Sequence, residues 1–210
     1  MTISFPRRSA IVAILLTTLS TPALADPDDG GFYVRAFGGW SSLSDTDLSG
    51  AASGRAGFGG GQIFGGAVGY DYGQNPFRTE IEFAYRSAEA DGSAGISGDF
   101  ASTTLALNGY YDFAPVAGGR LIPYVGAGLA YITEIDFDLS GGAAPGEYSD
   151  RGGIGYQLML GATVPLSERW SLNGEIRYFD AGTQELSGSG GLLSADYQTL
   201  DILLGASFQF

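Results

Sequence analysis

Three residue types are missing from this chain of 210 residues, and each absence excludes a class of chemistry: there is no cysteine, no histidine and no lysine. Without cysteine the chain has neither disulfides nor thiolate metal sites. Histidine is the usual general base in catalysis, and cysteine and lysine are the usual further nucleophiles or bases, so the many serines lack a side chain that would activate them. We expect no catalytic residue, and therefore no enzyme.

A pair of carboxylates is the remaining route to acid–base catalysis. Glu80 and Glu82 would lie on one face of an extended strand, because alternate residues of a strand share a face. Arg78 and Arg86 share that face and would keep both carboxylates ionised. We expect the pair to be structural.

Basic charge is also scarce. The chain has 10 basic residues against 23 acidic ones, a formal net charge of −13. Without Arg7 and Arg8, which belong to the leader described next, 8 basic residues stand against the same 23 acidic ones, which gives −15. Binding of nucleic acid depends on a basic face that neutralises phosphates, so a nucleic-acid partner is excluded.

Long apolar runs are absent beyond the N-terminus. There, Arg7 and Arg8 precede the apolar run Ile11–Leu19, and Ala23–Ala25 supplies the small residues that signal peptidase accepts. A retained membrane anchor is the alternative, but a spanning helix needs about 20 apolar residues and the run is shorter. We therefore expect residues 1–25 to be a cleavable signal peptide.

The rest of the chain shows a period-two alternation of apolar and polar residues, which is typical of strands with two different faces. Eight segments show it, and each is long enough to cross a bilayer as a tilted strand. They are Phe32–Leu43, Gln62–Tyr72, Phe77–Ser87, Phe100–Phe113, Leu121–Asp138, Gly153–Pro165, Trp170–Phe179 and Asp196–Phe210.

The connections between these segments alternate in length. The short ones are Gly73–Pro76, Ala114–Arg120 and Leu166–Arg169, and the long ones are Ser44–Gly61, Ala88–Asp99, Leu139–Gly152 and Asp180–Ala195. Tight periplasmic turns and long extracellular loops produce this alternation in a membrane barrel. Residues 26–210 are therefore predicted to be all-β, an eight-stranded antiparallel transmembrane β-barrel.

Aromatic residues recur at a fixed separation on the apolar face. Six of them form three pairs, each eight residues apart: Phe32 with Trp40, Phe77 with Tyr85, and Trp170 with Tyr178. Eight residues of strand span roughly 27 Å. A tilt of about 40° reduces this to roughly 21 Å, close to the apolar band of about 25 Å between aromatic girdles. We predict that these six lie at the two membrane interfaces.

Short motifs on these segments resemble a known family. Asn108–Phe113, Pro123–Gly128 and Gly174–Tyr178 look like strand motifs of the outer-membrane β-barrel domain family, which includes OmpX-like, opacity-type and small porin-family proteins. Phe210, with Phe208, resembles the C-terminal signal that the barrel-assembly machinery reads. The resemblance implies that machinery as a partner, eight strands, four loops outside the cell and both termini in the periplasm. It does not imply one activity, because members include adhesins and structural proteins.

Charged residues occupy inward positions of the predicted strands. They are Arg35, Arg78, Glu80, Glu82, Arg86, Asp112, Glu175, Arg177 and Asp201. These side chains could line a pore or plug the lumen. The interior of a barrel of about eight strands is just filled by side chains, and buried charges persist only when paired. Four arginines against five acids are close to balance, so we expect a plug.

Acidic residues gather near the bases of the predicted loops. They are Asp45, Asp47, Asp136, Asp138, Glu147 and Asp150. Calcium and magnesium prefer such oxygens, but no ligand spacing of a known site is present, so we expect a solvated acidic surface without metal or other cofactor. The stretches Gly57–Gly61 and Gly188–Gly191 lack the lysine and helix of a phosphate loop, and we predict flexible loop tips.

The sequence thus predicts an integral outer-membrane protein of structural or adhesin-like type, whose loops meet surface partners such as host molecules. Outer-membrane lipid and lipopolysaccharide would surround it. A narrow porin for small solutes or ions is the alternative function. A soluble lipocalin-like barrel is a third interpretation, but the inward charges and the girdle spacing argue against it.

Overall fold

The computed structural model describes residues 30–44, 46–50, 54–56, 60–89, 96–141, 146–188 and 191–210, and the predicted signal peptide lies outside them. Every regular element in these residues is a strand. The strands are β1 (Gly31–Leu43), β2 (Thr46–Gly50), β3 (Gly54–Ala56), β4 (Gly60–Asp71), β5 (Phe77–Glu89), β6 (Ile96–Asp112), β7 (Ile122–Gly141), β8 (Gly146–Asp150), β9 (Ile154–Pro165), β10 (Trp170–Gly188) and β11 (Gly191–Gln209). The described part contains no helix long and apolar enough to span a membrane.

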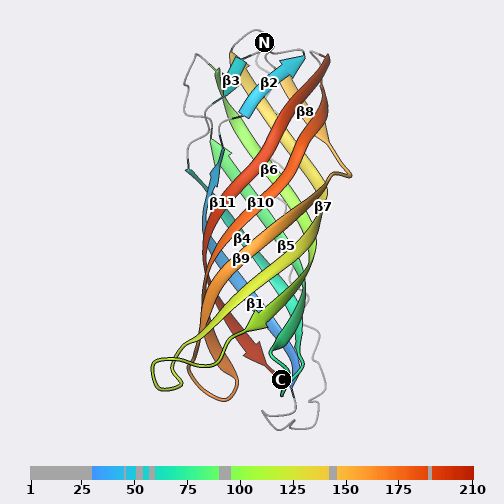
Figure 1. Ribbon diagram of the computed structural model, residues 1–210. Helices are drawn as coiled ribbons and strands as arrows, with labels where there is room; N and C mark the ends of the chain where they lie inside the picture. The colour runs from blue at the N-terminus through green and yellow to red at the C-terminus, as the bar shows by residue number, and fades with distance from the viewer. Residues whose placement is uncertain are drawn as a thin grey trace, which may run out of the picture.

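Eight of these strands close into a ring in which each pairs antiparallel with both neighbours (Figure 1). The order around the ring is β1, β4, β5, β6, β7, β9, β10 and β11. β11 pairs back with β1, from Tyr33 opposite Gln209 to Leu43 opposite Thr199. The eight ring strands correspond to the eight predicted segments, which confirms the predicted eight-stranded antiparallel barrel.

The first and last residues that the structure describes lie at the same end of the barrel. Gly30 and Phe210 lie at one end, where the backbone N–H of Phe210 donates to the carbonyl of Phe32. We call this the terminal end, at the bottom of Figure 1, and the opposite end the distal end.

The prediction of four long loops is wrong for much of their length, because strands continue through them. β10 and β11 pair as far as Gly188 opposite Gly191, across the range Asp180–Ala195 that was expected to be a loop. Gly60, Gly61, Gly188 and Gly191 are accordingly strand residues and not flexible tips, whereas residues 57–59 and 189–190 lie outside the described part. β2, β3, β8 and the distal ends of β5, β6 and β7 occupy the other three predicted loops.

The reason is that the two faces of the wall exchange polarity along the barrel. In the terminal half, the outer face is apolar and the inner face carries the charges. In the distal half, fourteen buried apolar residues form a core inside the ring while polar residues face outward. The 19 residues of β10 span roughly 48 Å at a tilt of about 40°, about twice the apolar band of a membrane. The barrel therefore extends well beyond the bilayer.

Aromatic residues on the outer face form two belts. At the terminal end Phe32, Phe77 and Trp170 are each more than half exposed, and each contacts a second ring on the neighbouring strand. Trp40 is similarly exposed on the distal side, where Tyr85 and Tyr178 lie partly exposed. Phe64 packs against Tyr85 and Tyr156 against Tyr178 in this distal belt.

Glycine on the inner wall makes room for inward rings. A Cβ added to Gly126 would lie 2.6 Å from the Tyr110 ring on the neighbouring strand, and one added to Gly161 would lie 2.4 Å from the Tyr124 ring. Gly109, on the outer face, has nothing within 4 Å of such a Cβ. Any side chain at Gly126 would therefore displace a ring that packs in the lumen.

Candidate functional site

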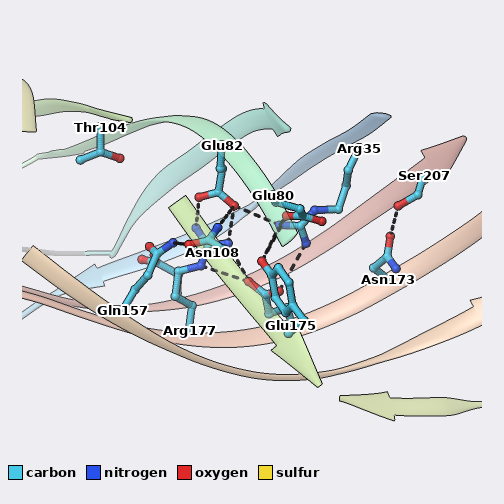
Figure 2. A network of polar contacts seen from close by, with 12 residues as sticks. Arg35, Glu80, Glu82, Thr104, Asn108, Gln157, Asn173, Glu175, Arg177 and Ser207 are labelled. Atoms are coloured by element: carbon cyan, nitrogen blue, oxygen red, sulfur yellow. Dashed lines mark hydrogen bonds and ion pairs between the residues drawn. The ribbon is translucent and has the colours of Figure 1, made fainter. Parts of the chain in front are cut away.

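A network of ion pairs crosses the middle of the lumen (Figure 2). Both guanidinium nitrogens Nη1 and Nη2 of Arg177 bind the two oxygens of Glu82, at 2.6 and 2.8 Å. Nε and Nη2 of the same residue bind Oε1 of Glu175, at 3.0 and 2.7 Å. Arg35 reaches Glu80 and Glu82 at 3.0 Å and Glu175 at 3.3 Å. Strands β1, β5 and β10 thus meet through charge across the barrel.

The network continues toward the terminal end through Arg78. Its guanidinium binds both oxygens of Asp112, at 2.6 and 2.9 Å, and donates to the Tyr33 hydroxyl at 3.1 Å. The Tyr33 hydroxyl in turn donates to Glu80 at 2.7 Å. A cavity of about 510 Å³ lies at the terminal end, and Arg78 and Asp112 contribute to its lining.

A separate ion pair lies on the distal side of the network. Arg86 binds Asp201 through Nε and Nη2, at 3.1 and 2.8 Å, and the Ser41 hydroxyl donates to Asp201 at 2.6 Å. The guanidinium of Arg86 also stacks over the Phe179 ring at 4.9 Å. Phe179 begins the apolar core, so this pair marks the boundary between the charged and the apolar lumen.

Seven of the nine predicted lumen residues therefore form one network, and the other two form the adjacent Arg86–Asp201 pair. Sequence reasoning missed the uncharged members. Tyr110 donates to Glu80, Tyr124 to Glu175 and Asn108 to Glu82. Their inward parity on the strands was the signal that could have identified them.

The distal half of the lumen is filled by apolar side chains. Phe100 packs against Phe137 and Tyr197 at centroid distances of 4.9 and 5.2 Å, and Tyr197 against Phe179 at 5.0 Å. These four rings are at most 2 % exposed. The lumen is thus occupied by side chains at two levels, a charged layer and an apolar one.

The outer face of the distal half carries a row of opposed acids. Glu89 pairs with Asp99, Asp99 with Asp138, and Asp138 with Glu147, on the four adjacent strands β5, β6, β7 and β8. All four are exposed. Like charges directly opposite each other are destabilising in a sheet, so the row is an electrostatic cost.

The other predicted acidic residues lie as follows. Asp136 lies on β7, within the predicted strand Leu121–Asp138, whereas Asp150 lies on β8, inside the range Leu139–Gly152 that was expected to be a loop. Burial together with the charges of Glu134 and Asp138 raises the pKa of Asp136. The side chains of Asp45 and Asp47 lie outside the described residues. Within the described part, no three acidic side chains are grouped so as to hold a metal ion.

The predicted assembly residues lie at the terminal end. Phe208 packs between Trp170 and Phe210, with centroid distances of 5.0 and 5.5 Å. Together they continue the outer belt of that end.

The chain belongs to the outer membrane protein beta-barrel domain family, whose family model matches residues 11–210. It is accordingly an integral outer-membrane protein. No similar protein was found among curated sequences.

Solved outer-membrane barrels share the fold at low sequence identity. Neisserial surface protein A is 20 % identical, with a TM-score of 0.60 over 86 % of this chain and 97 % of that one. OprG from Pseudomonas aeruginosa is 18 % identical, with a TM-score of 0.55 over 86 % and 97 %. AlkL is 20 % identical, with a TM-score of 0.54 over 92 % and 97 %. At these identities the likeness establishes the fold alone.

Proposed function

We propose that this protein is a non-catalytic, non-conducting barrel that presents its distal half outside the cell as an interaction surface. The observation that carries the proposal is a lumen occupied by side chains, with an apolar core inside the distal half. A pore would need a continuous polar path, whereas the apolar layer of Phe100, Phe137 and Tyr197 interrupts it. The extension has its own apolar core, so it can hold a fixed shape in water.

The orientation is part of the proposal. Short turns join the strands at the terminal end, and the longer extensions lie at the distal end. Outer-membrane barrels have short periplasmic turns and longer extracellular connections. Gly30 and Phe210 would then face the periplasm, and lipopolysaccharide would surround the distal belt.

The surface chemistry favours a cationic partner. The row Glu89, Asp99, Asp138 and Glu147 forms a continuous line of negative charge on one side of the extension. A basic peptide segment of a surface protein would relieve the repulsion along this row and gain from its field. An anionic polymer would be repelled.

Two measurements test the proposal. The refolded mature protein is expected to give a silent planar bilayer. Stable ohmic steps that change with Glu82→Ala would establish the narrow porin instead.

In lipid nanodiscs, an oligolysine probe is expected to bind at low salt, and dextran sulfate is not. The fourfold variant with Glu89→Gln, Asp99→Asn, Asp138→Asn and Glu147→Gln should weaken oligolysine binding at least tenfold. Glu168→Gln, an exposed change in a terminal-end turn, serves as the matched control and should leave binding unchanged. Equal binding by the fourfold variant would show that the acidic row does not bind the probe.

A further inference from the structure

Among the described residues, a stretch along one edge of β10 lacks backbone pairing. β10 pairs with β9 as far as Asp180 and pairs with β8 only from Ser187 onward. Between these points, the described residues Ala181–Leu186 and Asp150–Gly155 form no backbone pairs with each other. We call this six-residue gap the seam.

The opposite edges of the same strands are closed. β10 stays paired with β11 across the seam, with one bulge between Asp180 and Thr183. On the other side, Ile132 donates its N–H to the Gly153 carbonyl and accepts at its own carbonyl from the N–H of Gly152. Figure 1 shows the chain between β8 and β9 bending away from the wall on the right. The seam is therefore a local break on one side of β10, whose other side stays paired.

The seam joins two environments. Inside it lie Leu186, Ile132 and Phe179, all fully buried in the apolar core. Outside, its lower edge meets the distal belt, where Tyr156 and Tyr178 donate to Asp180 at 3.2 and 3.0 Å. Such aromatic belts lie at the level where acyl chains meet head groups. An apolar chain from that leaflet would pass through the seam into an apolar interior.

A polar side chain covers the seam. Nε2 of Gln184 donates to the Ala181 carbonyl at 2.6 Å, and a Cβ added to Gly153 would lie 2.1 Å from Gln184 Oε1. The amide thus spans from β10 to the facing chain. Rotation of this one side chain, followed by Leu186 behind it, would open a path to the core.

A single basic side chain lies on the rim. Arg151, in the facing segment, is 74 % exposed and is paired with Glu134 at 2.7 Å. Among the described side chains it is the one basic group on the outer surface of the distal half. An anionic head group at this level would compete with Glu134 for it.

We propose that the seam is a binding site for a single-chain anionic amphiphile of the outer leaflet. Its head group pairs with Arg151, and its acyl chain passes between Gln184 and Gly153 into the apolar core. The site rests on the orientation proposed above for its leaflet, but not on the acidic row or its partner.

A reversible lock tests the site, because the chain has no cysteine of its own. The double variant G153C/Q184C places two thiols across the seam and is oxidised after refolding. The matched control T163C/N173C locks β9 to β10 where they are already paired, at side chains 3.0 Å apart. Both proteins are placed in nanodiscs with palmitate that carries a diazirine at the chain end, and the labelled residues are identified by mass spectrometry.

The expected result is labelling of inward residues such as Ile132 and Leu186. It should fall at least tenfold in the oxidised seam lock, return on reduction and persist in the control lock. Labelling confined to outward residues such as Ile154 would overturn the proposal, and so would inward labelling that survives the seam lock. A heat-modifiability gel confirms that each locked protein is folded.

The head-group assignment has its own variant. Arg151→Gln should reduce inward labelling severalfold with the palmitate probe but not with the matching alcohol, which carries no charge. Equal loss with both probes would refute the pairing of the head group with Arg151. The acidic row is intact in all these variants, so a negative result here leaves the proposed binding of a cationic partner untouched.

Discussion

Replacing Arg177 by methionine removes the centre of the lumen network. The side chain is fully buried and makes four short contacts, two with Glu82 and two with Glu175. Without Arg177, the remaining ion pairs of Glu82 and Glu175 are with Arg35, which also pairs with Glu80. Removing one partner of a buried ion pair costs about 3–5 kcal/mol, because the other charge stays buried without compensation. We expect the free energy of unfolding to fall by this amount.

A double variant separates lost pairing from lost packing. R177M/E82Q removes one charge of each sign, so the net charge of the lumen returns to its original value. It should recover at least half of the loss, since one uncompensated carboxylate is gone. Arg120→Met, in an exposed terminal-end turn, is the control and should stay within about 0.5 kcal/mol of the parent.

The assay is urea unfolding of the barrel refolded in lipid vesicles, followed by the fluorescence of Trp40 and Trp170. Both tryptophans lie on the outer face, so their emission reports departure from the membrane. A loss below about 1 kcal/mol for R177M would show that the network is not the specific, paired structure described here. A double variant as unstable as the sum of its single changes would lead to the same conclusion.

Three further predictions concern other parts of the barrel. Gly126→Val forces a side chain into the Tyr110 ring, so the folded fraction on a heat-modifiability gel should fall severalfold, whereas Gly109→Val on the outer face should leave it unchanged. Burial and neighbouring carboxylates raise the pKa of Asp136, and a raised folded-state pKa means that protonation adds stability at low pH, which is lost as pH rises through that pKa. Protonation also removes the negative charge of Asp136, two residues from Asp138 of the acidic row. Oligolysine binding should weaken on acidification before ordinary aspartates titrate, and Asp136→Asn should remove that early step from the binding curve. Phe210→Ala should lower the amount assembled in the outer membrane of cells while refolding into lipid vesicles proceeds as before; an equal defect in both would indicate a loss of stability instead.

Strand parity was sufficient to predict the barrel and the inward charges. From Phe77 to Arg86 in β5, and from Trp170 to Tyr178 in β10, the charged residues fall on one parity and the large apolar residues on the other, so the side of each is readable. The partners were not readable. Arg177 binds Glu82 across 95 positions of sequence, and that contact depends on strand tilt and register around the whole ring. The inward tyrosines are hard to predict, because the girdle pattern favours outward positions for aromatic residues.

The distal half was mispredicted for a different reason. Leu193 and Tyr197 keep the inward parity that Asp201 has in the membrane half of β11, but they are apolar. Leu186 points inward because β10 bulges between Asp180 and Thr183, which exchanges its faces. A pattern search for apolar-outward strands therefore ends at the belt and assigns the glycine- and serine-rich remainder to loops. The exchange of faces follows from the change of solvent, because a barrel in water must bury its apolar side chains inside.

The same change of solvent limits where the wall can be open. In the hydrocarbon region each unpaired backbone group costs several kcal/mol, so every strand edge there must be paired. Water or polar head groups can satisfy such groups beyond the belt. The seam obeys this limit. β10 and β9 remain paired up to Asp180, and their pairing ends there. Asp180 accepts hydrogen bonds from Tyr156 and Tyr178, so the pairing ends at the level of the distal belt. The break in pairing thus lies as near to the hydrocarbon of the outer leaflet as the cost of unpaired backbone groups permits.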